Sequence, residues 1–317
     1  MILTRAPLRI TLGGGGTDLE PYCSEHGGFC VSAAINQYVY VSVLRPFLPG
    51  IYLKYSEIER AVRVEDVQYP IIRRALGLFE ETRTNPQIEI TTVADIPAGT
   101  GLGSSSAFTV ALLSALDTFY GSIHWTPDVL ADVAIEIERS VALTGRQDQY
   151  SAAYGGLSIL RMGGNDWTHR FELRLLPETM KRLHDRWLLF YTGAMHDAAG
   201  ALVGQGMMID NLGDIKIVGS QVAQTLLDGA FEELGRLFNQ QWSLKEARCP
   251  SPQSIHELRA HALMHGANGV KLIGAGEGGF LLCDTDEPDR LRQAMKDLAA
   301  AELPYQWDTE GAKVLLS

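Results

Sequence analysis

A short stretch rich in glycine and serine, Pro97–Ala107 (PAGTGLGSSSA), stands between a predicted strand and a strongly apolar predicted helix. Glycines let backbone N–H groups approach an oxyanion closely, and the partial positive charge of a helix N-terminus attracts that anion. Serine hydroxyls can donate hydrogen bonds to phosphate or ligate Mg²⁺. The same pattern also occurs as a simple capped loop, so an anion site and a structural turn both stay open at this point.

Two common nucleotide-binding motifs do not fit this loop. No glycine is followed by Gly-Lys-Ser/Thr at the Walker A spacing, and no glycine fingerprint lies in a clear parallel strand–helix–strand unit. Any nucleotide must therefore be bound on another scaffold.

Glycines recur in two further motifs, Ala6–Asp18 (APLRITLGGGGTD) and Lys271–Gly279 (KLIGAGEGG). Together with the Pro97–Ala107 loop, they resemble in order the three motifs of the GHMP kinases, named for galactokinase, homoserine, mevalonate and phosphomevalonate kinases. The matches extend over nearly the whole chain, and three motifs in order are far more specific than one glycine pattern. The resemblance implies an α+β, two-lobed fold with the active site in the cleft between lobes, and ATP and Mg²⁺ as cofactors.

The resemblance also assigns ATP binding to the central loop. The residues concerned are Pro97, Gly99, Gly101, Leu102, Gly103, Ser104, Ser105 and Ser106. Alignment of the loop favours Ser105 as the hydroxyl that faces the metal, with Ser104 and Ser106 donating to phosphate or capping the helix.

Glu136 and Glu138 are the candidates for a second metal ligand. On a helix, Ala134 and Val141 lie four residues before and three after Glu138, whereas Glu136 has Arg139 and Ser140 as neighbours. Glu138 is therefore expected to point toward the interior. The family pattern agrees, since it places a glutamate followed by a basic residue about ten positions before the catalytic aspartate.

Asp148 and Arg9 are the expected catalytic residues. An isolated aspartate in a sequence such as GRQDQY would predict a helix N-cap, but the matching family residue orients or deprotonates the substrate hydroxyl. Arg9 holds the basic position of the first motif. A guanidinium cannot act as a base, so its expected role is electrostatic.

Asp18 is expected to accept hydrogen bonds from sugar hydroxyls, because a carboxylate can accept two at once. Galactokinases have a Glu-His pair just before this Thr-Asp, where Gly15 and Gly16 stand here, so a larger pocket is expected. Within the family, the motifs most resemble the bacterial D-glycero-D-manno-heptose 7-phosphate kinases, which phosphorylate the anomeric hydroxyl. By this resemblance the substrate-binding residues are Gly14, Gly15, Gly16, Thr17, Asp18, Asp148, Gly274, Ala275 and Gly276. Glu277, where glycine is commoner, is a departure that puts none of these roles in doubt.

A phosphorylated sugar also needs cations at the far end of the pocket, and Lys245 with Arg248 is the best candidate pair, followed by Arg146. A solvated charged helix is an equally good interpretation of Lys245 and Arg248. A fucokinase-like enzyme, or one that phosphorylates an unphosphorylated sugar, would keep every motif without this pair. A non-catalytic sugar sensor would be expected to have lost Asp148 or Arg9.

These side chains must be positioned by elements that the sequence also predicts. Residues 1–175 are expected to form an N-terminal, ATP-binding lobe, and residues 176–317 a C-terminal lobe, with a transition over Gly163–Thr179. In the first lobe we expect strands Val31–Leu44, Gln87–Val93 and Leu157–Arg161, a helix Ser104–Tyr120 after a serine cap, and a helix from Thr126 to about Thr144. In the second we expect a strand Trp187–Tyr191, a glycine-rich strand pair Lys271–Cys283, a helix Pro288–Ala301 and a strand Tyr305–Leu316.

Composition sets the remaining limits. A chain of 317 residues is longer than one hydrophobic core usually supports, and a formal charge of −11 disfavours nucleic acid and anionic lipid as partners. Four scattered cysteines predict neither disulfides nor a zinc site. No apolar run approaches the length of a membrane span, so the cytoplasm is the expected location. A small-molecule sugar phosphate is the expected partner, and the oligomeric state stays open, with a homodimer among the options.

Overall fold

The computed structural model describes residues 1–79, 86–121, 125–194, 211–274 and 278–317. Its larger sheet follows the order β11-β1-β2-β5-β3-β4, and the hairpin β6–β7 pairs with the first part of β2. All neighbours are antiparallel except β3 and β5. The strands are β1 (Ile2–Gly13), β2 (Gly28–Leu44), β3 (Gly50–Lys54), β4 (Ile58–Ala61), β5 (Gln87–Ala94), β6 (Leu157–Met162), β7 (Thr168–Glu172) and β11 (Lys313–Leu316).

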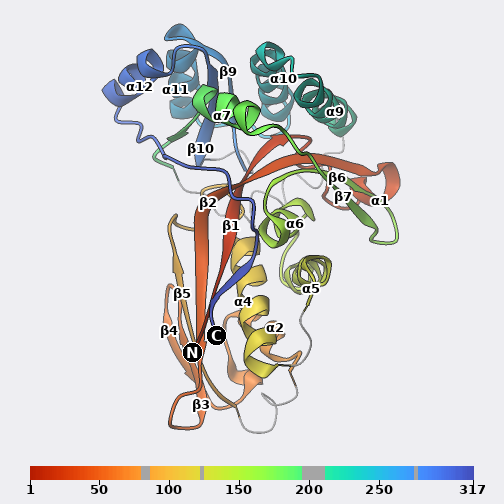
Figure 1. The fold of residues 1–317 in the computed structure, drawn as a ribbon, viewed down its shortest axis with the longest axis vertical. Coiled ribbons are helices and arrows are strands. Elements are labelled where there is room, and N and C mark those ends of the chain that lie inside the picture. Colours follow the sequence, from red (N-terminus) through yellow and green to blue (C-terminus); the bar gives the residue numbers. More distant parts are fainter. Residues whose placement is uncertain (80–85, 122–124, 195–210, 275–277) are drawn as a thin grey trace.

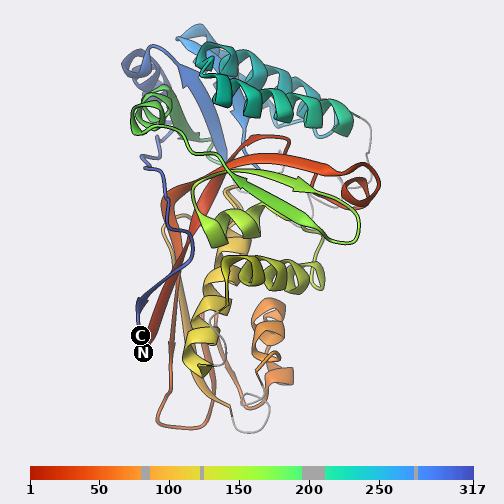
Figure 2. The same ribbon diagram turned by 45° about the vertical axis from the view of Figure 1, so that its right-hand side comes forward.

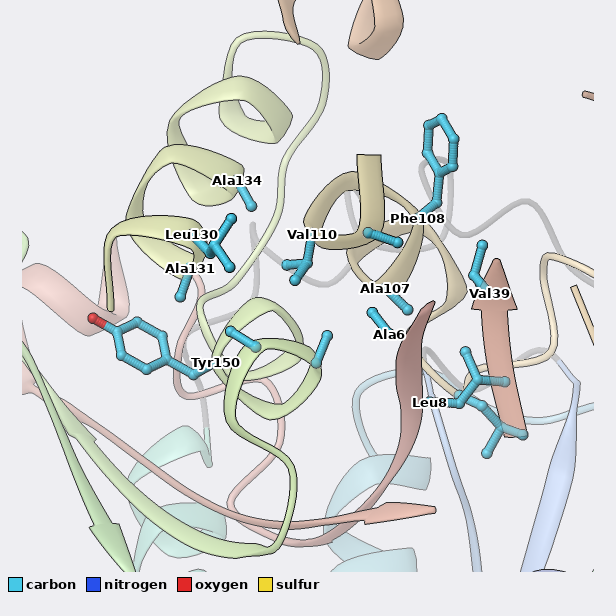
Figure 3. Packing of buried hydrophobic residues seen from close by; sticks show 14 of the residues in the cluster. Ala6, Leu8, Val39, Ala107, Phe108, Val110, Leu130, Ala131, Ala134 and Tyr150 are labelled. Atoms are coloured by element: carbon cyan, nitrogen blue, oxygen red, sulfur yellow. The ribbon is translucent and has the colours of Figure 1, made fainter. Parts of the chain in front are cut away.

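One face of this sheet is covered by helices (Figure 1). Helix α4 (Ser104–Tyr120) is buried from residue 106 to 117 because it is apolar all round, which is the pattern of a central helix. In Figure 3, Ala107 of α4 faces Ala6 of β1, while Val110 faces Leu130 of the next helix. The helices of this half are α1 (Tyr22–His26), α2 (Pro70–Leu76), α4, α5 (Pro127–Arg139) and α6 (Gln147–Tyr154), with a 3₁₀ turn at Val64–Asp66.

The second sheet is smaller, with the order β8-β10-β9 and antiparallel pairing throughout. Every residue of its central strand is buried, since helices cover both faces. The strands are β8 (Trp187–Tyr191), β9 (Ala267–Leu272) and β10 (Phe280–Thr285), and the helices are α7 (Pro177–Arg186), α9 (Leu212–Asp228), α10 (Leu234–Glu246), α11 (Gln253–Met264) and α12 (Pro288–Asp297), with a 3₁₀ turn at Phe231–Glu233. Figure 2 shows the teal helices α9 and α10 across the top of the molecule.

The α+β fold class is confirmed, and so are most predicted elements, but several bounds differ. Helix α5 ends at Arg139, five residues before Thr144, because residues 141–144 turn toward a cavity described below. Helix α4 has Gly103 in a left-handed conformation at its N-cap, with no side-chain hydrogen bond, so the predicted serine cap is wrong. Helix α12 ends at Asp297, and Ala299 has a φ of 55°, which is not helical.

Two other segments differ more clearly from expectation. The predicted transition Gly163–Thr179 contains β7, which pairs with β6. In the terminal segment only Lys313–Leu316 forms a strand, because the Asp308 carboxylate accepts backbone N–H groups of Glu310 (3.1 Å) and Gly311 (2.8 Å) and folds the chain into a turn. Strand β11 then pairs with β1, so the chain termini lie side by side (Figure 1). The lobe boundary at residue 175 stays a prediction.

Candidate active site

A cavity of about 940 Å³ brings all three glycine motifs together. Its lining comes from β1, the loop and first turn of α4, the end of α5, the start of α6, and from α9, α10 and β9 on the other side. The predicted residues that line it are Arg9, Gly15, Gly16, Asp18, Gly99, Gly101, Gly103, Ser104, Ser105, Ser106, Glu138, Asp148, Lys245, Arg248 and Gly274. Ala275, Gly276 and Glu277 lie outside the described residues.

The central loop presents backbone to the cavity. Gly99, Gly101 and Gly103 have φ angles of 78°, 79° and 80°, a left-handed conformation that strongly favours glycine. A Cβ on Gly101 would lie 2.5 Å from the Ile273 carbonyl oxygen, and one on Gly274 would lie 2.4 Å from the Gly101 Cα. The second and third motifs therefore need glycine because their backbones touch. The loop leads directly into α4, whose N-terminus is a site that attracts phosphate.

Four predicted residues shape these loops without lining the cavity. Leu102 is buried, and its carbonyl accepts the backbone N–H of Arg9 at 2.9 Å. The Pro97 carbonyl accepts the Thr100 hydroxyl at 3.1 Å. The Thr17 hydroxyl donates to the Gly14 and Phe29 carbonyls, and a Cβ on Gly14 would lie 1.8 Å from the Phe29 oxygen.

Arg9 and Asp148, which both line the cavity, form a two-point ion pair. Arg9 Nε donates to Asp148 Oδ1 and Nη2 donates to Oδ2, each at 2.7 Å. Asp148 stands in the first turn of α6, and its side chain keeps 26% of its exposure. A Cβ on Gly103 would lie 3.3 Å from Asp148 Oδ2, so the pair lies directly beside the glycine loop.

Asp18 caps helix α6 from a distant part of the chain. Its Oδ2 accepts the backbone N–H groups of Arg146 (2.9 Å) and Gln147 (3.1 Å), and its Oδ1 accepts that of Gly16 (3.2 Å). A Cβ on Gly145 would lie 1.9 Å from Asp18 Oδ2, so glycine is required there. Asp18 does line the cavity, but backbone donors occupy most of its acceptor capacity.

Glu138 points into the interior, as the helix-face argument predicts, and Glu136 is exposed. Its Oε2 accepts the Ser106 hydroxyl at 3.0 Å, while its buried Oε1 has no hydrogen-bond partner. Burial, helped by the Asp148 charge, raises the pKa of Glu138 to about 7, and the Ser106 hydrogen bond opposes the shift. A buried carboxylate oxygen without a donor suits a bound cation. Ser106 contacts this glutamate, whereas Ser105 is exposed toward the cavity.

Within the part of the chain that the structure describes, cations from α10, from the residues just after it and from β9 line the cavity. The Arg248 guanidinium lies beside the first motif, since a Cβ on Gly16 would be 3.6 Å from its Nη1. Lys245 donates to the carbonyls of Leu272 and Gly274, and burial lowers its pKa to about 8. Lys271 is buried and donates to the carbonyls of Thr11 (3.0 Å) and Leu12 (3.1 Å) and to Gln241 (2.6 Å). The sequence identified Lys271 only as the start of a motif.

Arg146, the reserve candidate for the substrate phosphate, is not part of the cavity lining. It is buried, and its guanidinium binds Glu20, Asp166 and two carbonyl oxygens of the β6–β7 turn. The expectation that it could hold a substrate phosphate is therefore wrong.

The opposite end of the cavity is apolar and aromatic, a feature that sequence patterns did not identify. The Tyr55 and Tyr69 rings stack with centroids 5.0 Å apart, and Tyr69 also contacts the Phe108 ring at 5.7 Å. Val39, Ile71 and Ile96 line the same cavity. An apolar, aromatic surface of this kind suits a flat ring.

Two family models match the chain and together cover more than half of it. The GHMP kinases N terminal domain matches residues 70–156, and the GHMP kinases C terminal domain matches residues 222–301. The two-lobed fold, the three glycine motifs and the cavity that they share agree with these two family models. The chain belongs to the GHMP kinases, and the prediction of a phosphoryl-transferring enzyme is confirmed. Members of this family use ATP, which supports ATP as the phosphoryl donor.

Individual relatives match 93% to 100% of the chain. The chain is 24% identical to the D-glycero-alpha-D-manno-heptose 7-phosphate kinase of Campylobacter jejuni, with 98% of each covered. It is 28% identical to part of the L-fucokinase/L-fucose-1-P guanylyltransferase of Bacteroides fragilis, covering 93% of this chain but 36% of that one. Its structure resembles a D-glycero-D-manno-heptose 1-phosphate kinase from Bacteroides thetaiotaomicron, with a TM-score of 0.82, 25% identity, and 100% and 99% coverage.

Neither a cluster of metal ligands nor a membrane-spanning helix is found among the described residues. Among the described residues no group of three or more histidine, cysteine or acidic side chains could hold a metal. None of the described helices combines the length and the apolar composition that a membrane span requires.

Proposed function

We propose that this chain is an ATP-dependent sugar kinase that phosphorylates the anomeric hydroxyl of D-glycero-α-D-manno-heptose 7-phosphate. The product would be the 1,7-bisphosphate, which leads to nucleotide-activated heptose for capsule or surface glycan. The observation that carries the proposal is the placement of two cations in the cavity wall, with Arg248 beside Gly16 of the first motif and Lys245 against Gly274 of the third. The likeness to the Campylobacter jejuni enzyme over both full lengths supports the same acceptor.

In this proposal the cavity holds the two substrates end to end. The adenine lies at the aromatic end near Tyr55 and Tyr69, and the phosphates of ATP lie along the glycine loop at the N-terminus of α4. The acceptor lies between Asp18, Asp148 and Arg248. Asp148 orients or deprotonates the anomeric hydroxyl, and Arg9 offsets negative charge on the transferring group.

Mg²⁺ completes the proposed site. Mg²⁺ in kinases is usually held by one or two carboxylates and the substrate phosphates, so a three-ligand protein cage is not needed. The bare Oε1 of Glu138 fits this role, with a loop serine hydroxyl as a second ligand, Ser105 by the family alignment. When bound, the metal offsets phosphate charge, and the protein holds the carboxylate that positions it.

The acceptor is tested by a coupled ADP-release assay across hexoses, heptoses and their terminal phosphates. Heptose 7-phosphate is expected to give the highest kcat/KM, and phosphorus NMR should place the new phosphate on the anomeric carbon. A higher kcat/KM with L-fucose would favour the fucokinase alternative, for which the likeness to the Bacteroides fragilis protein is the supporting observation. If none of the sugars causes ADP release, a non-catalytic sensor is favoured. A cytoplasmic location belongs to the same proposal.

Replacing Glu138 with glutamine should raise the Mg²⁺ concentration needed for half-maximal rate about tenfold or more, because the buried ligand loses its charge. Glu136→Gln is the matched control, since Glu136 lies on the same helix but is exposed. The measurement is a rate titration with Mg²⁺ at saturating ATP. A larger effect at Glu136 than at Glu138 would mean that the metal binds elsewhere.

Mg²⁺ binding should also weaken as the pH falls through 7. Burial raises the pKa of Glu138 to about 7, so below this pH the carboxylate is increasingly protonated and protons compete with the metal. The apparent Mg²⁺ affinity should fall by up to about tenfold per pH unit below 7 and level off above it. Titrations at pH 6, 7 and 8 measure this, and Glu138→Gln should remove most of the dependence. An unchanged slope in that variant would assign the titration to the substrate phosphates.

A further inference from the structure

Four ion-paired side chains form a closed ring just behind the cavity. Arg146 Nη2 contacts Glu20 Oε1 at 3.0 Å and Asp166 Oδ1 at 2.8 Å. Arg139 contacts the same two oxygens, at 3.6 Å and 2.6 Å. Positive and negative groups alternate around the ring, so each member has two partners of opposite charge. Because Arg146 is 1% exposed, the ring is anchored in the interior.

Each of three members stands one or two residues from a proposed site residue. Glu20 follows Asp18, Arg139 follows Glu138, and Arg146 precedes Asp148. The fourth member, Asp166, lies in the β6–β7 turn, and Arg146 also donates to the Gly163 (3.2 Å) and Trp167 (3.1 Å) carbonyls of that turn. The ring thus ties to the β6–β7 hairpin the three segments that carry the residues proposed to bind the sugar, the acceptor hydroxyl and the metal.

We propose that Arg146 and Asp166 are positioning residues, through which this ring fixes the N-terminus of α6, and with it Asp148, relative to Asp18 and Glu138. The inference rests on the proposed function for the roles of those three residues. None of the ring side chains lines the cavity, so none is expected to touch either substrate. Loss of the ring should slow phosphoryl transfer and leave binding of both substrates nearly unchanged.

The contacts at the start of α6 explain why this helix needs outside support. Its N-cap residue, Arg146, makes no side-chain cap hydrogen bond of its own, and the first N–H groups are satisfied by Asp18. If the Arg146 side chain loses its contacts with Glu20, Asp166 and the β6–β7 turn, the hydrogen bonds to Asp18 must hold the start of α6 without those contacts. A shift of about 1 Å in a reacting group can cost on the order of a hundredfold in rate.

The second half of the molecule offers a matched control for each variant. Arg186 is also buried and pairs with two aspartates, Asp284 and Asp286, but it does not line the cavity. Asp286 is exposed like Asp166, with side-chain exposures of 66% and 74%. Arg146→Met is therefore compared with Arg186→Met, and Asp166→Asn with Asp286→Asn. Asp166 has a φ of 56°, a conformation that asparagine also tolerates.

Arg146→Met is expected to lower kcat roughly ten- to a hundredfold, with the KM values for ATP and the acceptor within about twofold of wild type. Arg146→Lys should recover part of the loss. Lysine keeps the positive charge but cannot bind both carboxylates and both turn carbonyls at once. Asp166→Asn should lower kcat less, by about threefold to tenfold on the same scale, with little risk to folding. Neither control variant should change kcat, even where its melting temperature falls.

A second measurement separates this inference from the choice of substrate. Amide hydrogen exchange across residues 145–154 should be faster in Asp166→Asn and unchanged in Asp286→Asn, whether or not any sugar is accepted. Wild-type enzyme that accepts no sugar would overturn the proposed function alone. The inference is overturned if exchange at the start of α6 is unaffected, if kcat falls equally in the two control variants, or if KM rises while kcat is unchanged.

Discussion

Asp148→Asn is expected to lower turnover about 10²- to 10⁴-fold, the range that a positioned acid or base contributes, while nucleotide binding stays close to wild type. The carboxylate is held in the first turn of α6 by two Arg9 contacts of 2.7 Å. Asparagine keeps the shape but cannot accept a proton, and it offers only one oxygen to Arg9. The acceptor hydroxyl therefore loses the group that orients or deprotonates it.

Nucleotide affinity should not fall, because in the proposed site Asp148 binds the acceptor hydroxyl and its charge would repel the ATP phosphates. Removing that charge also leaves the Arg9 guanidinium, which is 7% exposed, free to interact with the phosphates. Affinity is measured by fluorescence titration with a nucleotide analogue, and turnover by ADP release. Asp132→Asn is the control, since Asp132 accepts a hydrogen bond from Tyr150 of the same helix but does not line the cavity. Turnover within tenfold of wild type would rule out the assigned role.

Much of the local structure follows from the sequence, because local patterns determine it. Helix α4 begins and ends at the predicted residues, since an apolar run between two glycines has few other options. Strand β8 also matches, because its apolar run Trp187–Tyr191 is bounded by the polar residues Arg186 and Thr192. The inward direction of Glu138 followed from its neighbours three and four residues away on one helix.

The arrangement of the site could not be predicted so well, since it depends on contacts between distant segments. Asp18 caps a helix that begins 129 residues later, and no periodic pattern records that contact. Gly219 of α9 packs on the first motif, where a Cβ would lie 2.8 Å from the Gly14 Cα. The sequence identified Lys271 only as the first residue of a motif and offered Arg146 as a reserve phosphate ligand, because charge alone does not reveal which oxygens a buried cation will bind.

Arg248→Ala is expected to reduce the preference for heptose 7-phosphate over unphosphorylated heptose roughly ten- to a hundredfold. The basis is the charge-assisted hydrogen bond to phosphate, worth about 1.5–3 kcal/mol. Arg248 is the stronger of the two predicted phosphate ligands because its guanidinium lies against Gly16 of the acceptor loop. Lys245 already donates to the Leu272 and Gly274 carbonyls, so it has one N–H left for a phosphate.

Lys245→Ala should therefore give a smaller loss of preference, and one that depends on pH. Burial lowers the pKa of Lys245 to about 8, so its charge is present below that pH and is lost as the pH rises through it. The difference between Lys245→Ala and wild type should shrink above pH 8, whereas the effect of Arg248→Ala should persist. The readout is the ratio of kcat/KM for the two sugars at pH 7 and pH 9.

Arg236→Ala is the control for both variants, because Arg236 lies on α10 with Lys245 but pairs with Glu233 outside the cavity. If Arg248→Ala and Lys245→Ala both keep the wild-type preference, the sugar phosphate is held elsewhere. Among the described residues that line the cavity, Arg9 and Lys271 are then the remaining cations, and Lys271 has three protein acceptors already. If the wild-type enzyme has no preference for the phosphorylated sugar, the heptose 7-phosphate assignment is wrong and a general sugar kinase replaces it.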